Sequence, residues 1–397
     1  MRRLFAFWGG RFTFVRLRRA CWAWHAAATT LPPGIPAMTV EAFFSQTYDE
    51  ARGKFLAAAQ TRGLRIERHL HPDVAGPSGE QLSIDTALLV PAQAQTLLIV
   101  TSGVHGVEGF CGSGCQTGLL QDEELFARLA AANVALLLVH AVNPYGFAHL
   151  RRVNEDNVDL NRNSVDFAEA ASANPAYLEV DPLLLPRTWP PSQADQAALQ
   201  HYMVTRGEKA LQDAATSGQY RVPDGMFYGG SAPCWSTLQM RGIVSRHAAG
   251  MSRLVWIDLH TGLGHYGHGE KIFNSPDAAE LERAMRTWGA DVRPIAAAGS
   301  VSSVVKGDLV GIAYELLPSI EKTCVTLEFG TLAPLAVLQA LRADHWLHRH
   351  PEQGAAQRTG IRQALRDAFY CDAPEWKGMV YAQTRMAVLQ ALVRFSG

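Results

Sequence analysis

The sequence predicts an α/β protein in which helices cover both faces of a mixed, largely parallel central sheet. Two observations lead to this prediction. Short continuous apolar runs, which are typical of strands buried on both faces, alternate along the chain with helical patterns. Several of these runs lead directly into polar residues and glycine, as in "LLIVTSGVHG", "RLVWIDLHTGLG" and "CVTLEFGT". Because ligands bind beyond the carboxyl ends of parallel strands, we expect these polar residues to lie close together.

The elements can be placed along the chain from their patterns. The helical spacing of Phe44, Tyr48, Ala51 and Phe55 predicts an amphipathic helix over 41–60. Other apolar and helical patterns predict strands at 83–90, 96–102 and 132–142, strands that lead into polar loops within 253–264 and 324–331, and helices at 110–120, 193–214 and 333–347. The third of these strands is expected to end in a turn at Asn143-Pro144.

The first 37 residues differ in composition from the rest of the chain. Residues 1–37 are rich in arginine and aromatic residues, and no acidic residue precedes Glu41. We expect them to be a disordered extension, or the result of a start assigned too early, with Met38 as the true first residue. A transit peptide or a basic arm is the alternative. Residues 38–397 are expected to form one catalytic domain with a proline-containing insertion at about 164–250.

The overall composition excludes several classes of protein. The chain has 397 residues, of which 48% are hydrophobic, and a formal net charge of -1. This balance gives no electrostatic reason to expect nucleic acid or a membrane surface as a partner. No apolar run reaches the roughly 20 residues of a membrane span. The six cysteines have no metal-site or redox spacing, so we expect free thiols and a cytoplasmic location.

The loop "SGVHGVEG" carries His105 and Glu108 directly after a buried strand. The spacing His-x-x-Glu is weak evidence by itself, because either residue could be an ordinary polar group of a loop. Glycine on both sides, however, lets the backbone turn tightly enough for the two side chains to converge. Imidazole and carboxylate are zinc ligands, and catalytic zinc usually has three protein ligands. His260, at the end of another strand, is the expected third ligand, in preference to the histidines at 140, 149, 265 and 268.

A second polar stretch, "HLRRVNEDNVDLNRN", follows the Asn143-Pro144 turn. A charged loop usually faces solvent, but this one directly follows a buried strand. Arginine forks suit the recognition of carboxylates, and a second arginine could stabilise an oxyanion. In "TLEFGT", Glu328 lies within an apolar strand, where an unpaired charge costs several kcal/mol. It could pair with an arginine, but beside a zinc ion it is a natural general base.

Together these residues resemble the zinc carboxypeptidase (carboxypeptidase A-like) superfamily, and more closely a bacterial branch of carboxypeptidase-like proteins. The resemblance extends over about 96–331, with the motifs His105-x-x-Glu108, "NPYGF", "RRVNEDNVDLNRN", His260 and Glu328 in matching order. It implies a carboxypeptidase A-like fold and one zinc ion held by His105, Glu108 and His260. It also implies that Asp159 bonds the outer nitrogen of His105 and fixes its tautomer.

The resemblance further implies the roles of four residues around the metal. Arg152 would stabilise the oxyanion, although the register of the loop decides whether Arg151 or Arg152 faces the site. Asn161 and Arg162 would bind the free carboxylate of a C-terminal residue, and Glu328 would be the general base. Two departures are evident. The family's enzymes have a substrate-covering tyrosine about twenty residues before the catalytic glutamate, where this chain reads "SSVVKGDLVG". The insertion at 164–250 is also unlike those enzymes, so the side-chain pocket is not implied.

The sequence therefore predicts a zinc-dependent hydrolase of an amide bond next to a free carboxylate, most simply a metallocarboxypeptidase. Its substrate would be a peptide or an acylated amino acid with a free carboxylate. One alternative is an N-acyl amino acid deacylase of the succinylglutamate desuccinylase or aspartoacylase kind, which such motifs also resemble. Another is an inactive binding protein on the same fold. The sequence leaves the preferred side chain and the oligomeric state open.

Overall fold

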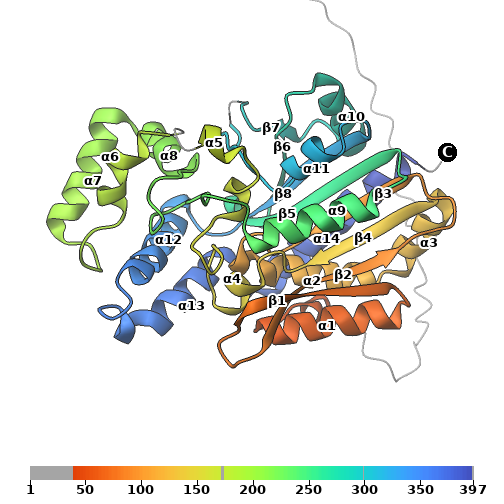
Figure 1. Cartoon of the computed structure of the whole chain (residues 1–397), viewed down its shortest axis with the longest axis horizontal. Coiled ribbons are helices and arrows are strands. Elements are labelled where there is room, and N and C mark those ends of the chain that lie inside the picture. The colour runs from red at the N-terminus through yellow and green to blue at the C-terminus, as the bar shows by residue number, and fades with distance from the viewer. Residues whose placement is uncertain (1–38, 171–173, 298, 396–397) are drawn as a thin grey trace, which may run out of the picture. The chain divides into compact units, whose positions relative to one another are not determined.

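The computed structural model describes residues 39–170, 174–297 and 299–395. At its centre is an eight-stranded mixed β-sheet (Figure 1). The predicted extension at 1–37 lies outside the described residues. The strands, in sheet order, are β1 (Arg65–Ala75), β2 (Gln81–Leu89), β4 (Val134–His140), β3 (Thr96–Thr101), β5 (Arg253–Tyr266), β8 (Glu321–Gly330), β6 (Gly269–Phe273) and β7 (Val292–Pro294). The four central strands, β4, β3, β5 and β8, are parallel to one another. The predicted mixed, largely parallel sheet is therefore confirmed.

Helices cover both faces of this sheet because alternate residues of the central strands point to opposite sides. On β3, Leu98 and Val100 belong to one core, and Leu97 and Ile99 to another. The first core is closed by α1 (Tyr48–Thr61), α2 (Gly109–Leu120), α3 (Glu123–Ala132), α10 (Ala278–Trp288) and α14 (Pro374–Val393). The second is closed by α9 (Trp235–His247) and α11 (Gly311–Leu316).

The segment at about 164–250, which the sequence predicts to be an insertion and which is called the insertion below, is helical, and its middle part packs away from the sheet. Its first four helices are α5 (Phe167–Ala170), α6 (Tyr177–Leu184), α7 (Gln193–Arg206) and α8 (Glu208–Thr216). Residues of α6, α7 and α8 form a third core with α12 (Pro334–Arg349) and α13 (Arg358–Phe369). Helices α6, α7 and α8 lie on the same side of the sheet as α12 in Figure 1. The same core includes Val107 of the His105 loop, so the insertion packs against the predicted metal site.

Three local expectations differ from the structure. The predicted helix over 41–60 begins only at Tyr48, because the Thr47 side chain accepts a hydrogen bond from Glu50 N and caps it there. A 3₁₀ turn at Val40–Phe43 replaces its first part. The predicted helix over 193–214 is divided into α7 and α8 at Gly207, which has a φ of 93°. His260 was expected in a loop but lies inside β5, which continues to Tyr266.

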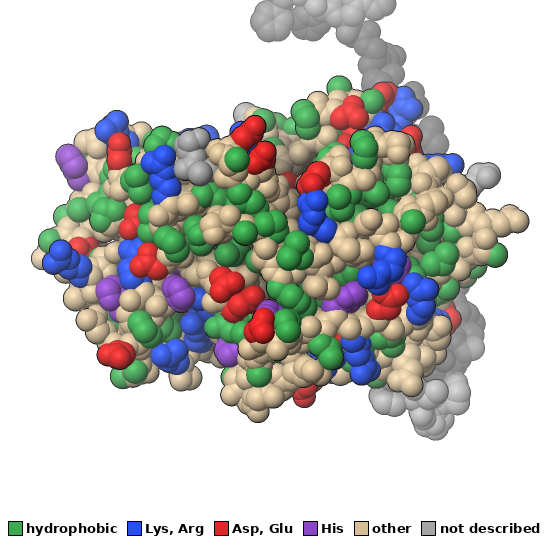
Figure 2. All heavy atoms as spheres, viewed as in Figure 1, with side chains coloured by type: hydrophobic (Ala, Val, Ile, Leu, Met, Phe, Trp, Pro, Cys, Tyr) green, Lys and Arg blue, Asp and Glu red, His purple; other side chains and the backbone are tan. Residues whose placement is uncertain are grey.

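The described residues have three further features, which concern their helices, their cysteines and their surface charges. None of their helices combines the length and apolar character needed to cross a bilayer. Their five cysteines form no disulfide. On the face of the molecule in Figure 2, lysine and arginine side chains are interspersed with acidic ones instead of forming one large patch.

Candidate metal centre

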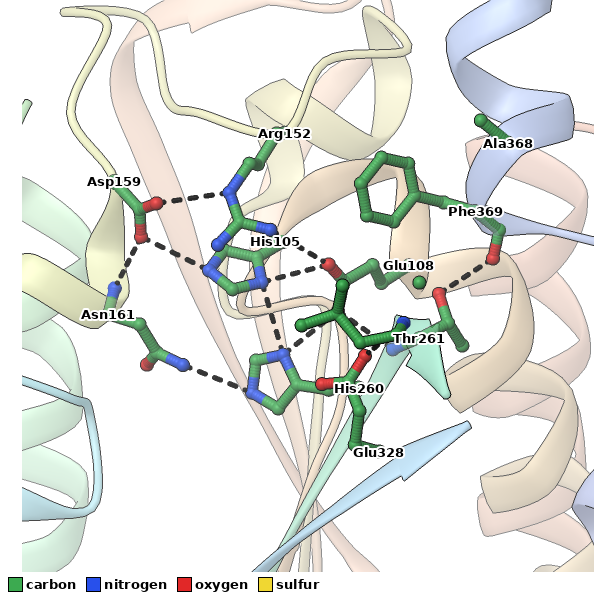
Figure 3. A network of polar contacts seen from close by, with 12 residues as sticks. His105, Glu108, Arg152, Asp159, Asn161, His260, Thr261, Glu328, Ala368 and Phe369 are labelled. Carbon is green, nitrogen blue, oxygen red and sulfur yellow. Dashed lines mark hydrogen bonds and ion pairs between the residues drawn. The ribbon is translucent and has the colours of Figure 1, made fainter. Parts of the chain in front are cut away.

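The three predicted metal ligands meet just beyond the carboxyl end of β3, beside the middle of β5 (Figure 3). His105 follows β3, Glu108 ends the 3₁₀ turn Gly106–Glu108, and His260 lies in β5. His105 Nδ1 and His260 Nδ1 are each 2.9 Å from an oxygen of the Glu108 carboxylate. The two Nδ1 atoms are 3.1 Å apart. One ligand atom from each residue lies within 4.8 Å of the others, and all three residues are buried.

Glycine is necessary in the His105 loop because the chain passes close to its neighbours. An added Cβ at Gly106 would lie 2.0 Å from the backbone carbon of Gly146, in the short helix α4 (Pro144–Ala148). Gly103 has a φ of 63°, a conformation that side chains with a Cβ rarely adopt. The predicted convergence of His105 and Glu108 therefore depends on the surrounding glycines.

The donor atoms fit a divalent cation. Each imidazole has a carboxylate at its other nitrogen: His105 Nε2 is 3.1 Å from Asp159, and His260 Nε2 is 2.8 Å from Asp258. When these Nε2 atoms donate their protons to the carboxylates, both Nδ1 lone pairs point at each other and at Glu108. Such an arrangement is repulsive without a cation between the rings, whereas two imidazoles and one carboxylate are a common ligand set for catalytic zinc.

The charges around the ligands also favour a cation. Burial acts to lower the pKa of His260, but Asp258 and Glu108 outweigh it and raise the pKa well above its usual value. Burial acts to raise the pKa of Asp159, but Arg152 and His105 hold it well below its usual range. Asp159 thus stays charged, and the two carboxylates that raise the pKa of His260 would equally attract a metal ion.

Asp258 is a functional candidate that the sequence interpretation missed. It lies two residues before His260 on β5, so both side chains point to the same face of the sheet. Its other oxygen accepts a hydrogen bond of 2.5 Å from Thr101 Oγ1, which in turn accepts one from Trp256 Nε1. An aspartate in a buried apolar strand, two positions before a candidate ligand, was the signal that could have identified it.

We predict that Asp258→Asn weakens zinc binding about 10- to 100-fold, because it removes the negative charge behind His260. Its amide also cannot accept hydrogen bonds from both Thr101 and His260. The zinc Kd is measured by competition with a chromophoric chelator. Asp85→Asn is the matched control, since Asp85 is equally buried in β2 but pairs with Arg52. Equal zinc affinity in wild type and Asp258→Asn would contradict the assignment.

The two arginines of "HLRRVNEDN" point to different places. Arg152 donates from Nε to Asp159 at 3.0 Å and from Nη1 to Glu108 at 3.3 Å, so its guanidinium lies beside the metal ligands. Its Nη2 has no hydrogen-bond partner among the described residues. Arg151 donates instead to Asp344 and Asn157. Arg152, and not Arg151, is therefore placed to interact with a group bound at the metal.

Asn161 and Arg162 lie in the 3₁₀ turn Leu160–Arg162, on the His260 side of the centre. Asn161 Nδ2 is 3.3 Å from His260 Nε2, and its Oδ1 accepts a bond from Leu309 N. The Arg162 guanidinium is buried and donates to two backbone carbonyls, Thr216 O and Asn161 O. Across the described ranges, no carboxylate lies close enough to form an ion pair with it.

Glu328 is the residue paired with His260 across β5 and β8, so both side chains point to the same face of the sheet. It is 8% exposed, and its Oε1 accepts a 3.0 Å bond from Leu263 N. The alternative of a structural ion pair with an arginine is not found within the part of the chain that is described. Burial, and then the charge of Glu108, raise the pKa of Glu328 to about 7.

The other histidines do not join the centre, as expected. His140 and His149 bond Ser113 and Ala75 O, respectively. His265 and His268 are exposed, at the end of β5 and in the turn after it. Tyr314, the tyrosine nearest to Glu328 in the sequence, donates to Glu280 instead.

Comparisons with known proteins found one matching family model and several similar solved structures. A family model described as "Protein of unknown function (DUF2817)" matches residues 44–383. No curated protein matches the chain. Similar solved structures include a metallo-carboxypeptidase from Pseudomonas aeruginosa in complex with (2-guanidinoethylmercapto)succinic acid. That similarity has 16% identity, covers 89% of this chain and 71% of the other, and has a TM-score of 0.41.

Two further solved structures show a similar degree of likeness. A metallo-carboxypeptidase from Burkholderia cenocepacia has 13% identity, with 89% of this chain and 70% of the other covered, and a TM-score of 0.40. Bovine thrombin-activatable fibrinolysis inhibitor, in complex with tick carboxypeptidase inhibitor, has 12% identity, with 81% and 97% covered, and a TM-score of 0.40. Because these identities and TM-scores are low, the chemistry of the centre is inferred from its own residues and their contacts.

Proposed function

The chain belongs to the DUF2817 family, and we propose that it is a zinc-dependent hydrolase that cleaves an amide bond next to a free carboxylate, most simply a metallocarboxypeptidase. One observation supports this proposal most directly. Three buried ligand atoms converge on one point, and the carboxylate of Glu328 lies on the adjacent strand, opposite His260. A metal site with a neighbouring glutamate that makes no ion pair among the described residues has the parts that amide hydrolysis needs.

His105 Nδ1, Glu108 and His260 Nδ1 would hold the zinc ion, which when bound supplies Lewis acidity that activates water and polarises a carbonyl group. Glu328 accepts the proton of the attacking water. Leu263 N already donates a hydrogen bond to Oε1 of Glu328, so Oε2 is the oxygen that accepts this proton. Glu328 then passes the proton to the leaving nitrogen. The free N–H groups of Arg152 donate to the oxyanion, and Asp159 keeps that guanidinium in place.

The preference for a free carboxylate is inferred from Arg162. A buried guanidinium that donates only to carbonyl oxygens keeps its full positive charge and two N–H groups that have no partner among the described residues. An anionic group of the substrate would neutralise it, and a carboxylate matches the geometry of the arginine fork. Arg162 donates to the backbone carbonyl of Asn161, and the side chain of Asn161 lies 3.3 Å from His260 Nε2, so the bound carboxylate would lie on the His260 side of the centre.

The proposal is tested with zinc-loaded protein and three sets of substrates: peptides with a free carboxyl terminus, the same peptides amidated, and N-acyl amino acids. We expect hydrolysis of the free-acid peptides with release of the C-terminal residue. Preferred cleavage of N-acyl amino acids would support the deacylase instead. No hydrolysis of any set by protein with full zinc occupancy would overturn the proposal and favour a binding protein.

We predict that Arg162→Ala lowers kcat/KM for free-acid substrates about 10- to 100-fold, because a charged hydrogen bond is lost. The amidated substrate is the internal control, since it presents no charge to Arg162 and should change by less than about threefold in the same preparation. An equal loss on both substrates would show that Arg162 supports the local structure without recognising the carboxylate.

A further inference from the structure

Phe227 lies in the irregular segment between α8 and α9, far along the chain from every predicted site residue. It is 5% exposed, and its φ is 53°. A bulky residue rarely adopts this left-handed conformation, which costs free energy and persists only when the surroundings impose it. Backbone strain of this kind concentrates at functional sites, which makes the contacts of the ring informative.

The ring of Phe227 contacts both arginines of the proposed site. The guanidinium carbon of Arg152 is 5.3 Å from the ring centroid, and that of Arg162 is 5.7 Å away. Two guanidinium groups repel each other, and both are buried. An aromatic ring attracts cations to its face, with an energy that increases when water is excluded. The ring therefore offsets part of the repulsion and fixes where each arginine lies.

The backbone around Phe227 is anchored on both sides. The carbonyl of Phe227 accepts a bond from Gln219 N, and Met226 N donates to the hydroxyl of Tyr177 at 2.6 Å. The next carbonyl, Tyr228 O, accepts a 2.7 Å bond from Asp159 N, the residue that bonds both His105 and Arg152. The segment is thus attached to the centre through its backbone as well as through the ring.

We propose that Phe227 is a positioning residue, which holds Arg152 and Arg162 at the separation needed to receive the carbonyl and the carboxylate of one substrate. The proposal rests on the function inferred above for these arginines. It makes the insertion at about 164–250 part of the active site, because the insertion supplies this ring. The ring need not touch the substrate; it acts through the two guanidinium groups.

The test compares Phe227→Leu, which removes the aromatic face, with Phe227→Tyr, which keeps it. Both substitutions retain a side chain with a Cβ, so backbone strain is matched. Phe167→Leu is the control for loss of an aromatic ring elsewhere in the insertion, where the contact is with Tyr220. Three properties are measured: zinc content, the Kd for 3-phenylpropanoate by calorimetry, and kcat and KM on free-acid and amidated peptides.

We expect Phe227→Leu to keep its zinc and to raise the Kd for 3-phenylpropanoate about tenfold, equivalent to about 1.4 kcal/mol. KM for free-acid peptides should rise similarly, and Phe227→Tyr and Phe167→Leu should stay within about twofold of wild type. An unchanged Kd in Phe227→Leu, or an equal defect in Phe227→Tyr, would overturn the proposal. Failure of the wild-type protein to bind 3-phenylpropanoate would also overturn the proposal. Probe binding that depends on Phe227, without any hydrolysis, would overturn the proposed function and leave this inference intact.

Discussion

Replacing Glu328 with glutamine is expected to leave zinc bound and to lower kcat by about 10² to 10⁴, the range that a positioned general base contributes. The substitution keeps the size of the side chain and an oxygen that can accept the bond from Leu263 N. It removes the oxygen that takes the proton from water. Because Glu328 is not one of the three ligand residues, the metal content should stay at one zinc per chain.

The pH profile gives a second measurement of the same role. Burial and the charge of Glu108 raise the pKa of Glu328 to about 7 before a metal binds, and a nearby dication would lower it. A carboxyl group acts as a base only when it is ionised. Activity should therefore fall as the pH drops from 7 through the pKa of the zinc-loaded form. Zinc content is measured across the same range, so that metal loss is not mistaken for protonation of Glu328.

Near-normal turnover in Glu328→Gln with full zinc occupancy would refute the assignment. The matched control is Glu270→Gln, a buried glutamate on β6 that is paired with Glu328 across the sheet. Glu270 accepts bonds from Val301 N and Ser300 Oγ, so its hydrogen bonds are made to the 300–301 segment and not to the ligands. A similar loss in both variants would point to disturbance of β6 and β8, not to the loss of a base.

The sequence predicted the parallel sheet and the ligands for a common physical reason. Apolar runs such as Leu97–Val100 fit only a strand buried on both faces, and the polar residues after them must then lie at one edge of the sheet. This reasoning brought His105, Glu108 and His260 together without knowledge of the strand order. The resemblance assigned the oxyanion role to Arg152, but the sequence left open which of Arg151 and Arg152 faces the centre, because that depends on the register of the loop.

Other parts of the site were not predicted because their roles depend on tertiary packing. The position of Asp258 in a buried strand was a signal, but only the orientation of His260 gives this carboxylate its role. Phe227 belongs to a segment without periodicity, and its importance arises where the insertion meets two arginines from another loop. Helix α1 begins only at Tyr48 because the side chain of Thr47 caps it there, although the pattern before Thr47 is also helical. The roles of Arg162 and Glu328 stay predictions until they are tested.

Replacing His260 with alanine is expected to abolish both zinc binding and hydrolysis. Two ligands remain, His105 and Glu108, whereas catalytic zinc usually needs three from the protein. Measured zinc should fall from one ion per chain to a trace. In wild type, removal with a chelator should abolish activity and added zinc should restore it. Because a ligand that binds only the folded state stabilises it, zinc should raise the Tm of wild type but not of His260→Ala.

His265→Ala is the matched control for this prediction, since His265 is an exposed histidine at the end of the same strand. It should keep its zinc, its activity and the zinc-dependent rise in Tm. One zinc ion retained by His260→Ala, at the same affinity as in wild type, would place the metal elsewhere. The proximity of the two Nδ1 atoms would then have to be explained by a shared proton, which the raised pKa of His260 would allow. The metal measurement therefore decides between these two explanations independently of any substrate.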